Sequence, residues 1–145
     1  MQSNQTDTTS CSVIKVRGLH KNFGPREVLR GINLDVRAGD ILSVMGPSGS
    51  GKSTLLYCMA GILAADKGEV FFNGKNLAHY SANSLIALRK TSFGFIFQFG
   101  ELISELPVRD NIALPLLLQG VRKKQAYKTA DEWASLVGIQ NVISA

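Results

Sequence analysis

One stretch of eight residues limits what this chain can fold into more than any other. Residues 46–53 read Gly-Pro-Ser-Gly-Ser-Gly-Lys-Ser and match the phosphate-loop pattern G-x-x-x-x-G-K-[ST] at every fixed position. A short, mostly apolar run at residues 41–45 precedes the loop, and good helix formers follow it up to Gly61. A buried strand, a glycine-rich turn and a helix in this order are the setting that a phosphate loop requires.

The residue types in this loop suit the binding of a nucleoside triphosphate. Glycines can adopt positive φ and turn the loop N–H groups toward the phosphates, where the following helix adds its positive N-terminal end. Lys52 would carry the full charge to the β- and γ-phosphates, and the Ser53 hydroxyl would be one ligand of a bridging Mg²⁺. We therefore expect ATP or GTP, with Mg²⁺, at Gly46, Pro47, Ser48, Gly49, Ser50, Gly51, Lys52, Ser53 and Thr54. The alternative is a chance glycine-rich turn.

Length, composition and charge limit the kind of protein that this sequence can encode. A chain of 145 residues, 45% of them hydrophobic, suits one domain with a workable core, and the net charge of +5 favours anionic partners without choosing among them. Residues 1–12 are polar and have no basic start followed by an apolar stretch, so we expect a flexible tail and no secretory signal. The apolar run at residues 112–118 is far shorter than the ~20 residues of a membrane-spanning helix, so we expect any membrane role to come through a partner.

Hydrophobic periodicity predicts further elements around the loop. Alternation at residues 13–19 and 32–36 indicates two antiparallel strands, with Phe23 on the loop between them. We also expect buried strands at 41–45 and 93–97, a strand at 68–73 closed by Asn73-Gly74, and helices at 52–60, 84–90, 108–118 and 123–137.

Three segments outside the loop make the chain resemble the nucleotide-binding subunits of ABC transporters, most closely the branch of lipoprotein-release and macrolide-export ATPases. They are Asn22-Phe23-Gly24, Lys67-Gly68-Glu69-Val70 and Gly94-Phe95-Ile96-Phe97-Gln98. The resemblance runs from about residue 13 to residue 137. It implies an α/β fold in which a P-loop NTPase (RecA-like) core carries an N-terminal antiparallel β subdomain and the start of a helical subdomain. The implied division is a tail at 1–12, the β subdomain and partial core at 13–98, and the Q-loop region with the first helices at 99–145.

The resemblance assigns roles to residues outside the loop. An aromatic residue on the early turn of the family stacks on adenine, which here is Phe23, and Val28 would pack beside the base. A glutamine in the family touches Mg²⁺ and the attacking water and links the nucleotide to the membrane subunit, which here is Gln98. The implied catalytic residues are Lys52 and Gln98, and the implied metal ligands are Ser53 and Gln98. The alternatives are a strand-end aromatic at Phe23 and a solvated strand end at Gln98.

The sequence contains none of four elements that the family uses to hydrolyse ATP: an LSGGQ-like signature, a hydrophobic strand ending in Asp-Glu, a D-loop and a switch histidine. We therefore expect the C-terminal half of the ABC domain to be absent from this chain, which by itself should bind but not hydrolyse ATP. As part of a complete domain, the resemblance implies an ATPase that forms a homodimer and energises a membrane permease of the export or mechanotransmission type from the cytoplasmic face. A truncated regulatory nucleotide-binding fragment is the alternative, and the Gln98 setting argues against a small-molecule kinase.

Other polar and aromatic residues are expected to be structural. Pro107 stands where relatives usually have Thr, so a proline at the first helical position would replace a hydroxyl cap. The Arg122-Lys123-Lys124 run lacks interleaved aromatics, so we expect a solvated face and no nucleic-acid partner. His20 and His79 have no carboxylate or cysteine neighbours at ligand spacing. Packing roles are expected for Cys58, Tyr127 and Trp133.

Overall fold

The computed structural model describes residues 12–97 and 100–143 of the chain. It comprises two compact units, Met1–Leu85 and Ile86–Ala145. The phosphate loop belongs to the first unit. The predicted position of Gln98 lies outside the described residues.

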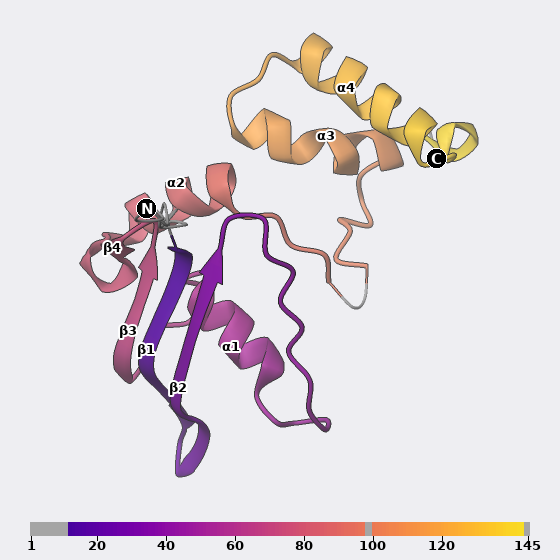
Figure 1. Ribbon diagram of the computed structural model, residues 1–145. Coiled ribbons are helices and arrows are strands. Elements are labelled where there is room, and N and C mark those ends of the chain that lie inside the picture. Colours follow the sequence, from indigo (N-terminus) through magenta and orange to yellow (C-terminus); the bar gives the residue numbers. More distant parts are fainter. Residues whose placement is uncertain (1–11, 98–99, 144–145) are drawn as a thin grey trace, which may run out of the picture. The chain divides into compact units, whose positions relative to one another are not determined.

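A four-stranded antiparallel sheet, in the order β2-β1-β3-β4, forms the base of the first unit (Figure 1). Its strands are β1 (Ser12–Phe23), β2 (Arg26–Arg37), β3 (Lys67–Phe72) and β4 (Lys75–Asn76). The predicted antiparallel pair is confirmed, and both strands are longer than expected. The prediction that Phe23 lies on the loop between these strands is wrong. Phe23 is the last residue of β1 and pairs with Arg26, because two residues suffice to join the strands.

The turn between β3 and β4 is the predicted Asn73-Gly74 pair. Asn73 has φ 46° and Gly74 has φ 77°, so both central residues adopt left-handed backbone. Two left-handed residues twist the chain in the sense that neighbouring antiparallel strands require. This hairpin, which the sequence predicted, places Phe72 opposite Lys75.

Helix α1 (Lys52–Met59) covers the sheet and closes the core of the first unit (Figure 1). Its buried residues are Leu55, Cys58 and Met59, and the strands contribute Val16, Leu19, Leu29 and Val70 to the same apolar interior. Cys58 is 2% exposed, and burial raises the pKa of its thiol. The expectation that Cys58 packs as a small apolar residue is therefore confirmed.

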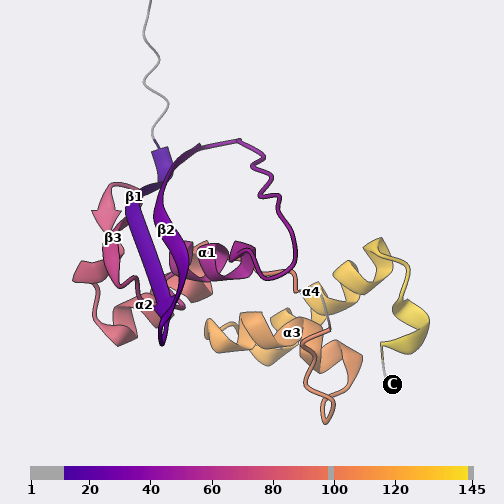
Figure 2. The same ribbon diagram turned by 90° about the horizontal axis from the view of Figure 1, so that it is seen from below.

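The two predicted core strands at residues 41–45 and 93–97 are not formed. Ile41, Met45 and Ile96 are 97%, 89% and 102% exposed. A strand needs a neighbour that takes up its backbone hydrogen bonds, and no strand of the described residues pairs with either segment. Residues 38–51 instead form a long connection, without helix or strand, from the end of β2 to the start of α1 (Figure 2).

A short 3₁₀ helix, η1 (Leu77–His79), follows β4, and α2 (Ala82–Ser92) comes next. The Ser81 hydroxyl accepts a hydrogen bond from the Ser84 backbone N–H at 3.2 Å, a bond that satisfies one free N–H of the first helical turn. The predicted helix at residues 84–90 is thus confirmed and is slightly longer. Leu77 is buried and anchors the short 3₁₀ helix.

The second unit contains a pair of helices, α3 (Val108–Leu118) and α4 (Lys123–Leu136), followed by η2 (Gln140–Val142). Both predicted helices are confirmed. They lie side by side because α4 presents a stripe of alanines at four-residue spacing, Ala126, Ala130 and Ala134, and the first two pack with Ala113 of α3. No helix in the described part of the chain is both long and apolar enough to cross a bilayer.

Polar contacts also join α3 to α4. The Arg109 guanidinium donates through Nε to Asp131 at 2.7 Å and lies 5.3 Å from the ring centre of Tyr127. Tyr127 therefore packs in the subdomain, as predicted. Trp133 does not, since 57% of it is exposed; it lies at the edge of the alanine stripe rather than between the helices.

Pro107 occupies the position before the first helical residue of α3. Its ψ of 156° is not helical, and the helix begins at Val108. The predicted placement of Pro107 at the first helical position is therefore wrong by one residue. The Asn111 side chain ties the preceding segment to the first turn of α3, because its amide nitrogen donates to the carbonyl oxygen of Leu106 at 2.9 Å.

Candidate nucleotide-binding site

The phosphate loop ends directly in the first turn of α1. Gly51 caps the helix with φ 94°, and its carbonyl oxygen accepts from the Leu55 N–H at 2.8 Å. Inside the loop, the Ser50 N–H donates to the carbonyl oxygen of Pro47 at 3.3 Å. The predicted order of turn and helix is confirmed, with the helix beginning at Lys52.

Gly51 is required by both conformation and space. Its φ lies in the left-handed region, which L-residues with a Cβ adopt at a cost. A Cβ added there would lie 2.8 Å from Cγ1 of Val28 and 3.2 Å from the Val28 carbonyl oxygen. The end of the loop therefore approaches β2 closely, and this approach places Val28 beside the loop.

The Lys52 side chain turns back over the loop. Its Nζ donates to the carbonyl oxygens of Gly46 at 2.9 Å and Pro47 at 2.8 Å. The Lys52 ammonium group therefore places a full positive charge at the beginning of the loop. The first turn of α1 contains no acidic residue, so the positive N-terminal end of the helix is not neutralised from within that turn.

The two hydroxyl residues after the lysine differ in exposure. Ser53 is exposed and Thr54 is half-buried. An exposed hydroxyl at the start of the helix is free to face a ligand, as the magnesium role of Ser53 requires. His, Cys, Asp and Glu side chains form no group of three or more that could hold a metal ion within residues 12–97 and 100–143.

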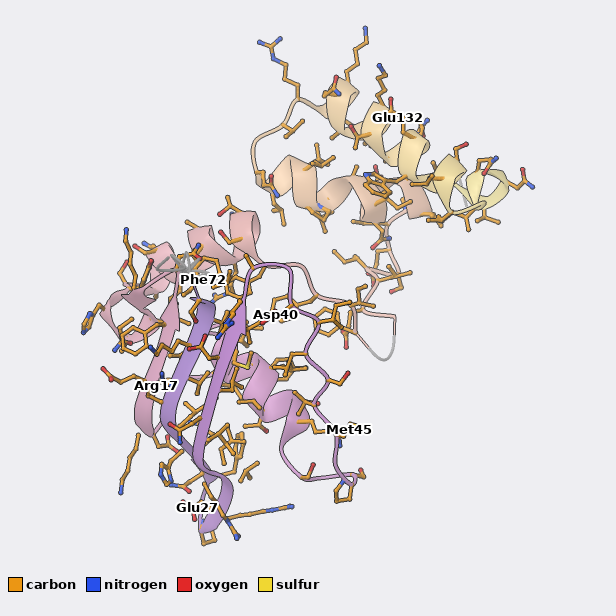
Figure 3. The ribbon with its side chains drawn as sticks, in the orientation of Figure 1. Arg17, Glu27, Asp40, Met45, Phe72 and Glu132 are labelled. Atoms are coloured by element: carbon orange, nitrogen blue, oxygen red, sulfur yellow. The ribbon has the colours of Figure 1, made fainter. Side chains whose placement is uncertain are left out.

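An open hollow of about 530 Å³ lies between the start of β2 and the loop. Figure 3 labels Glu27 at the turn of the β1–β2 hairpin and Met45 on the stretch that leads into the loop. The guanidinium Nη2 of Arg26 donates to the carbonyl oxygen of Gly49 at 3.2 Å across this hollow. The residues that line it are Pro25, Arg26, Glu27, Val28, Arg30, Gly49 and Ser50.

The structure brings some of the predicted site residues together. Val28 lines the hollow together with two residues of the loop, Gly49 and Ser50. Phe23 lies at the end of β1 and is 50% exposed, and the Nζ of Lys21 lies 5.8 Å from its ring centre, but Phe23 does not line the hollow. Arg26, three residues after Phe23, was not predicted from the sequence, where no pattern distinguishes it.

His20 has a carboxylate neighbour that its spacing in the sequence did not indicate. Its Nδ1 lies 2.9 Å from Oε1 of Glu27, because the β1–β2 pairing brings the two positions together. Arg30 lies 3.7 Å from the other oxygen of the same carboxylate. The contact ties the two strands of the hairpin and is structural.

A family model described as "ABC transporter" matches residues 29–144, most of the chain. The chain belongs to the ABC transporter family. It is 37% identical over 127 residues to the lipoprotein-releasing system ATP-binding protein LolD of Bacteroides thetaiotaomicron, covering 88% of this chain and 58% of the relative. It is 40% identical over 130 residues to the methionine import ATP-binding protein MetN of Mesorhizobium japonicum, covering 90% of this chain and 35% of the relative. The chain thus spans little more than half of LolD.

Solved structures share the fold. The dimeric ATP-binding cassette MJ0796 in a post-hydrolysis state bound to ADP and Pi superposes with a TM-score of 0.82 at 27% identity, covering 90% of this chain and 60% of that one. The cbiO1 protein from Clostridium perfringens, part of the ABC transporter complex cbiONQ, gives 0.74 at 27% identity, with coverage of 92% and 53%. The predicted family and the predicted α/β P-loop fold class are therefore confirmed.

Proposed function

We propose that residues 46–54 bind ATP with Mg²⁺, and that the chain is the nucleotide-binding part of an ATPase that energises a membrane permease. One observation carries the proposal. The Lys52 ammonium donates to the carbonyl oxygens of Gly46 and Pro47, so the loop holds a full positive charge at its beginning. A loop of this kind suits the phosphates of a nucleotide.

The glycine at the beginning of the loop leaves room for a neighbouring side chain. A Cβ added to Gly46 would lie 2.8 Å from the Ser50 hydroxyl oxygen. Lys52 can exchange a carbonyl acceptor for a phosphate oxygen and form a charge-assisted hydrogen bond, which is stronger than a neutral one. The phosphate thereby gains both backbone donors and a full charge.

Magnesium fits the oxygen donors of this site. Ser53 would contribute its exposed hydroxyl, and phosphate oxygens are the hard ligands that Mg²⁺ prefers. Gln98 would contribute its amide oxygen; its position lies outside the described residues. Bound Mg²⁺ would neutralise phosphate charge, while the chain itself holds and orients the nucleotide.

The base would lie on the hairpin side of the loop. Phe23 at the end of β1 offers an exposed ring for stacking, and Val28 packs next to Gly51. Stacking of a base on an aromatic ring typically contributes ~1–3 kcal/mol. We propose the same division of the chain as from the sequence: a tail at residues 1–12, a nucleotide-binding region at 13–98, and a Q-loop and helical region at 99–145.

The role in transport is proposed from the relatives. LolD is named for lipoprotein release and MetN for methionine import, and MJ0796 is described as a dimer. We propose a homodimer of complete cassettes bound to a permease of the export or mechanotransmission type at the cytoplasmic face of the membrane. Residues 1–145 alone are proposed to bind ATP without turnover, because no Asp-Glu pair follows a hydrophobic strand in this sequence.

A competition titration tests the binding proposal. The chain is titrated with a fluorescent ATP analogue, and ATP, AMP and inorganic triphosphate are then added as competitors, with Mg²⁺ and with a chelator. ATP and triphosphate are expected to displace the analogue, AMP to compete poorly, and the chelator to weaken ATP. Equal competition by AMP and ATP would remove the phosphate loop as the source of affinity.

A further inference from the structure

We propose that Arg26 is a positioning residue of the nucleotide site, which orients the Gly49–Ser50 peptide so that the Ser50 N–H faces the bound phosphates. The inference rests on the proposed function and adds one residue that the phosphate-loop pattern does not contain. Arg26 lies at the start of β2, on a hairpin remote from the loop in sequence. Its Nη2 donates to the Gly49 carbonyl oxygen at 3.2 Å.

The hydrogen bond from Arg26 to Gly49 fixes the orientation of the whole Gly49–Ser50 peptide. A peptide unit is planar and trans, so its C=O and N–H bonds point in opposite directions. When Arg26 holds the Gly49 oxygen on the hairpin side, the Ser50 N–H must point to the opposite side. In the structure the Ser50 N–H donates to the Pro47 carbonyl oxygen at 3.3 Å, a bond within the loop that it would exchange for one to a phosphate oxygen.

Two cations therefore hold three carbonyl oxygens of the loop. Lys52 binds those of Gly46 and Pro47, and Arg26 binds that of Gly49. A glycine-rich loop is free to flip its peptides, because glycine adopts positive and negative φ with similar ease. A flipped Gly49–Ser50 peptide would present an oxygen to the phosphates in place of a donor, so a clamp at Gly49 favours anion binding.

The exposure and the charge of Arg26 also suit a role in positioning the loop. It is exposed, so the residue needs no buried partner and its replacement leaves the core intact. It also borders the hollow shared with Val28 and Ser50, which places a second positive charge beside the loop. A guanidinium has several donors in a fixed plane, so it can hold a carbonyl oxygen and still face an anion.

The test compares three variants of the full chain with the parent: Arg26→Ala, Arg26→Lys and Arg17→Ala. Arg17 lies on the sheet away from the loop, where Figure 3 labels it, and its removal costs the same charge. Affinity for inorganic triphosphate and for ATP is measured by competition, and the Ser50 amide resonance is followed by NMR. Thermal midpoints are recorded for all four proteins.

Arg26→Ala is expected to weaken triphosphate and ATP alike, by about tenfold, at an unchanged thermal midpoint. The Ser50 amide shift on adding triphosphate should shrink, and Arg26→Lys should restore part of both. Arg17→Ala should change affinity by less than about twofold. Equal losses in Arg26→Ala and Arg17→Ala, or a Ser50 shift that Arg26→Ala leaves intact, would overturn the inference. A parent that binds neither triphosphate nor ATP would overturn the proposed function and, with it, this inference.

Discussion

The Nζ of Lys52 lies 2.9 Å from the carbonyl oxygen of Gly46, so the charged residue at the end of the phosphate loop is bonded to the residue that begins it. This contact joins the two ends of the loop. The end of the loop is held against β2 by the close approach of Gly51 to Val28. Both contacts depend on backbone conformation, and both can be tested by substitution.

Gly51→Ala is expected to destabilise the chain by about 1–3 kcal/mol and to impair ATP binding, because a Cβ at φ 94° is strained and meets Val28 at 2.8 Å. Gly39→Ala is the matched control: Gly39 has φ 84°, but an added Cβ meets nothing within 4 Å. Denaturant unfolding and ATP titration measure both effects. A Gly51→Ala variant no less stable than Gly39→Ala would show that the approach to Val28 is unimportant.

Phe23→Ala is expected to weaken ATP much more than inorganic triphosphate, by the ~1–3 kcal/mol of a lost base stack, since only the nucleoside has a ring to stack. Phe23 is half exposed, so the fold should survive its removal. Competition titrations with the two ligands measure the difference. Equal losses for both would remove Phe23 from the site and leave it as a strand-end aromatic.

Elements that form from local interactions were predicted well. Helix α3 has the predicted bounds, and α4 ends within one residue of its predicted end. Both follow from helical periodicity, and the end of α4 also follows from the glycine at position 138. The β3–β4 turn followed from the Asn73-Gly74 pair alone. The phosphate loop was recognisable because its chemistry requires fixed residue types at fixed spacing.

Features that depend on distant partners were not predicted, or were predicted wrongly. The apolar run at residues 41–45 has the composition of a buried strand, but a strand also needs a neighbour, and composition does not reveal whether one is present. The Arg26 contact with Gly49 joins residues far apart in sequence, and arginine at a strand start carries no distinguishing pattern. The His20–Glu27 contact was missed for the same reason, since it follows from strand register.

Stability is expected to depend on the carboxylate of Asp66 in acid. The backbone N–H of Asn22 and the Lys21 ammonium both donate to it and lower the pKa of Asp66. A carboxyl whose folded pKa is depressed contributes stability above its unfolded pKa, and the contribution is lost as pH falls through the folded value. Between about pH 5 and about pH 2, the parent should therefore lose more stability than Asp66→Asn.

Denaturant midpoints across that pH range measure the Asp66 effect. Glu101→Gln serves as a control, because it removes an exposed carboxylate from the second unit. Parent and Asp66→Asn curves that run parallel through the acid range would mean that the bonds to Asn22 and Lys21 contribute nothing to folding.

Gln98→Ala is expected to separate binding from turnover in a full-length ABC subunit that contains this chain. ATP binding should largely persist, because the loop amides and Lys52 still hold the phosphates. Hydrolysis should fall, and stimulation by the permease should fall further than the basal rate, because the proposed link to the membrane subunit is lost. ATPase rates with and without the permease measure both. A variant that matches the parent in basal rate and in stimulation would mean that Gln98 has no part in hydrolysis or coupling.

The central claim is that the phosphate loop binds ATP through Lys52, and a titration of Lys52→Ala with a fluorescent ATP analogue tests it most directly. Lys75→Ala is the control, since Lys75 is an exposed lysine on β4 with the same charge. Circular dichroism establishes that both variants are folded. We predict that Lys52→Ala loses ATP binding while Lys75→Ala binds like the parent. Unchanged affinity in a folded Lys52→Ala variant would contradict the assignment of the nucleotide site.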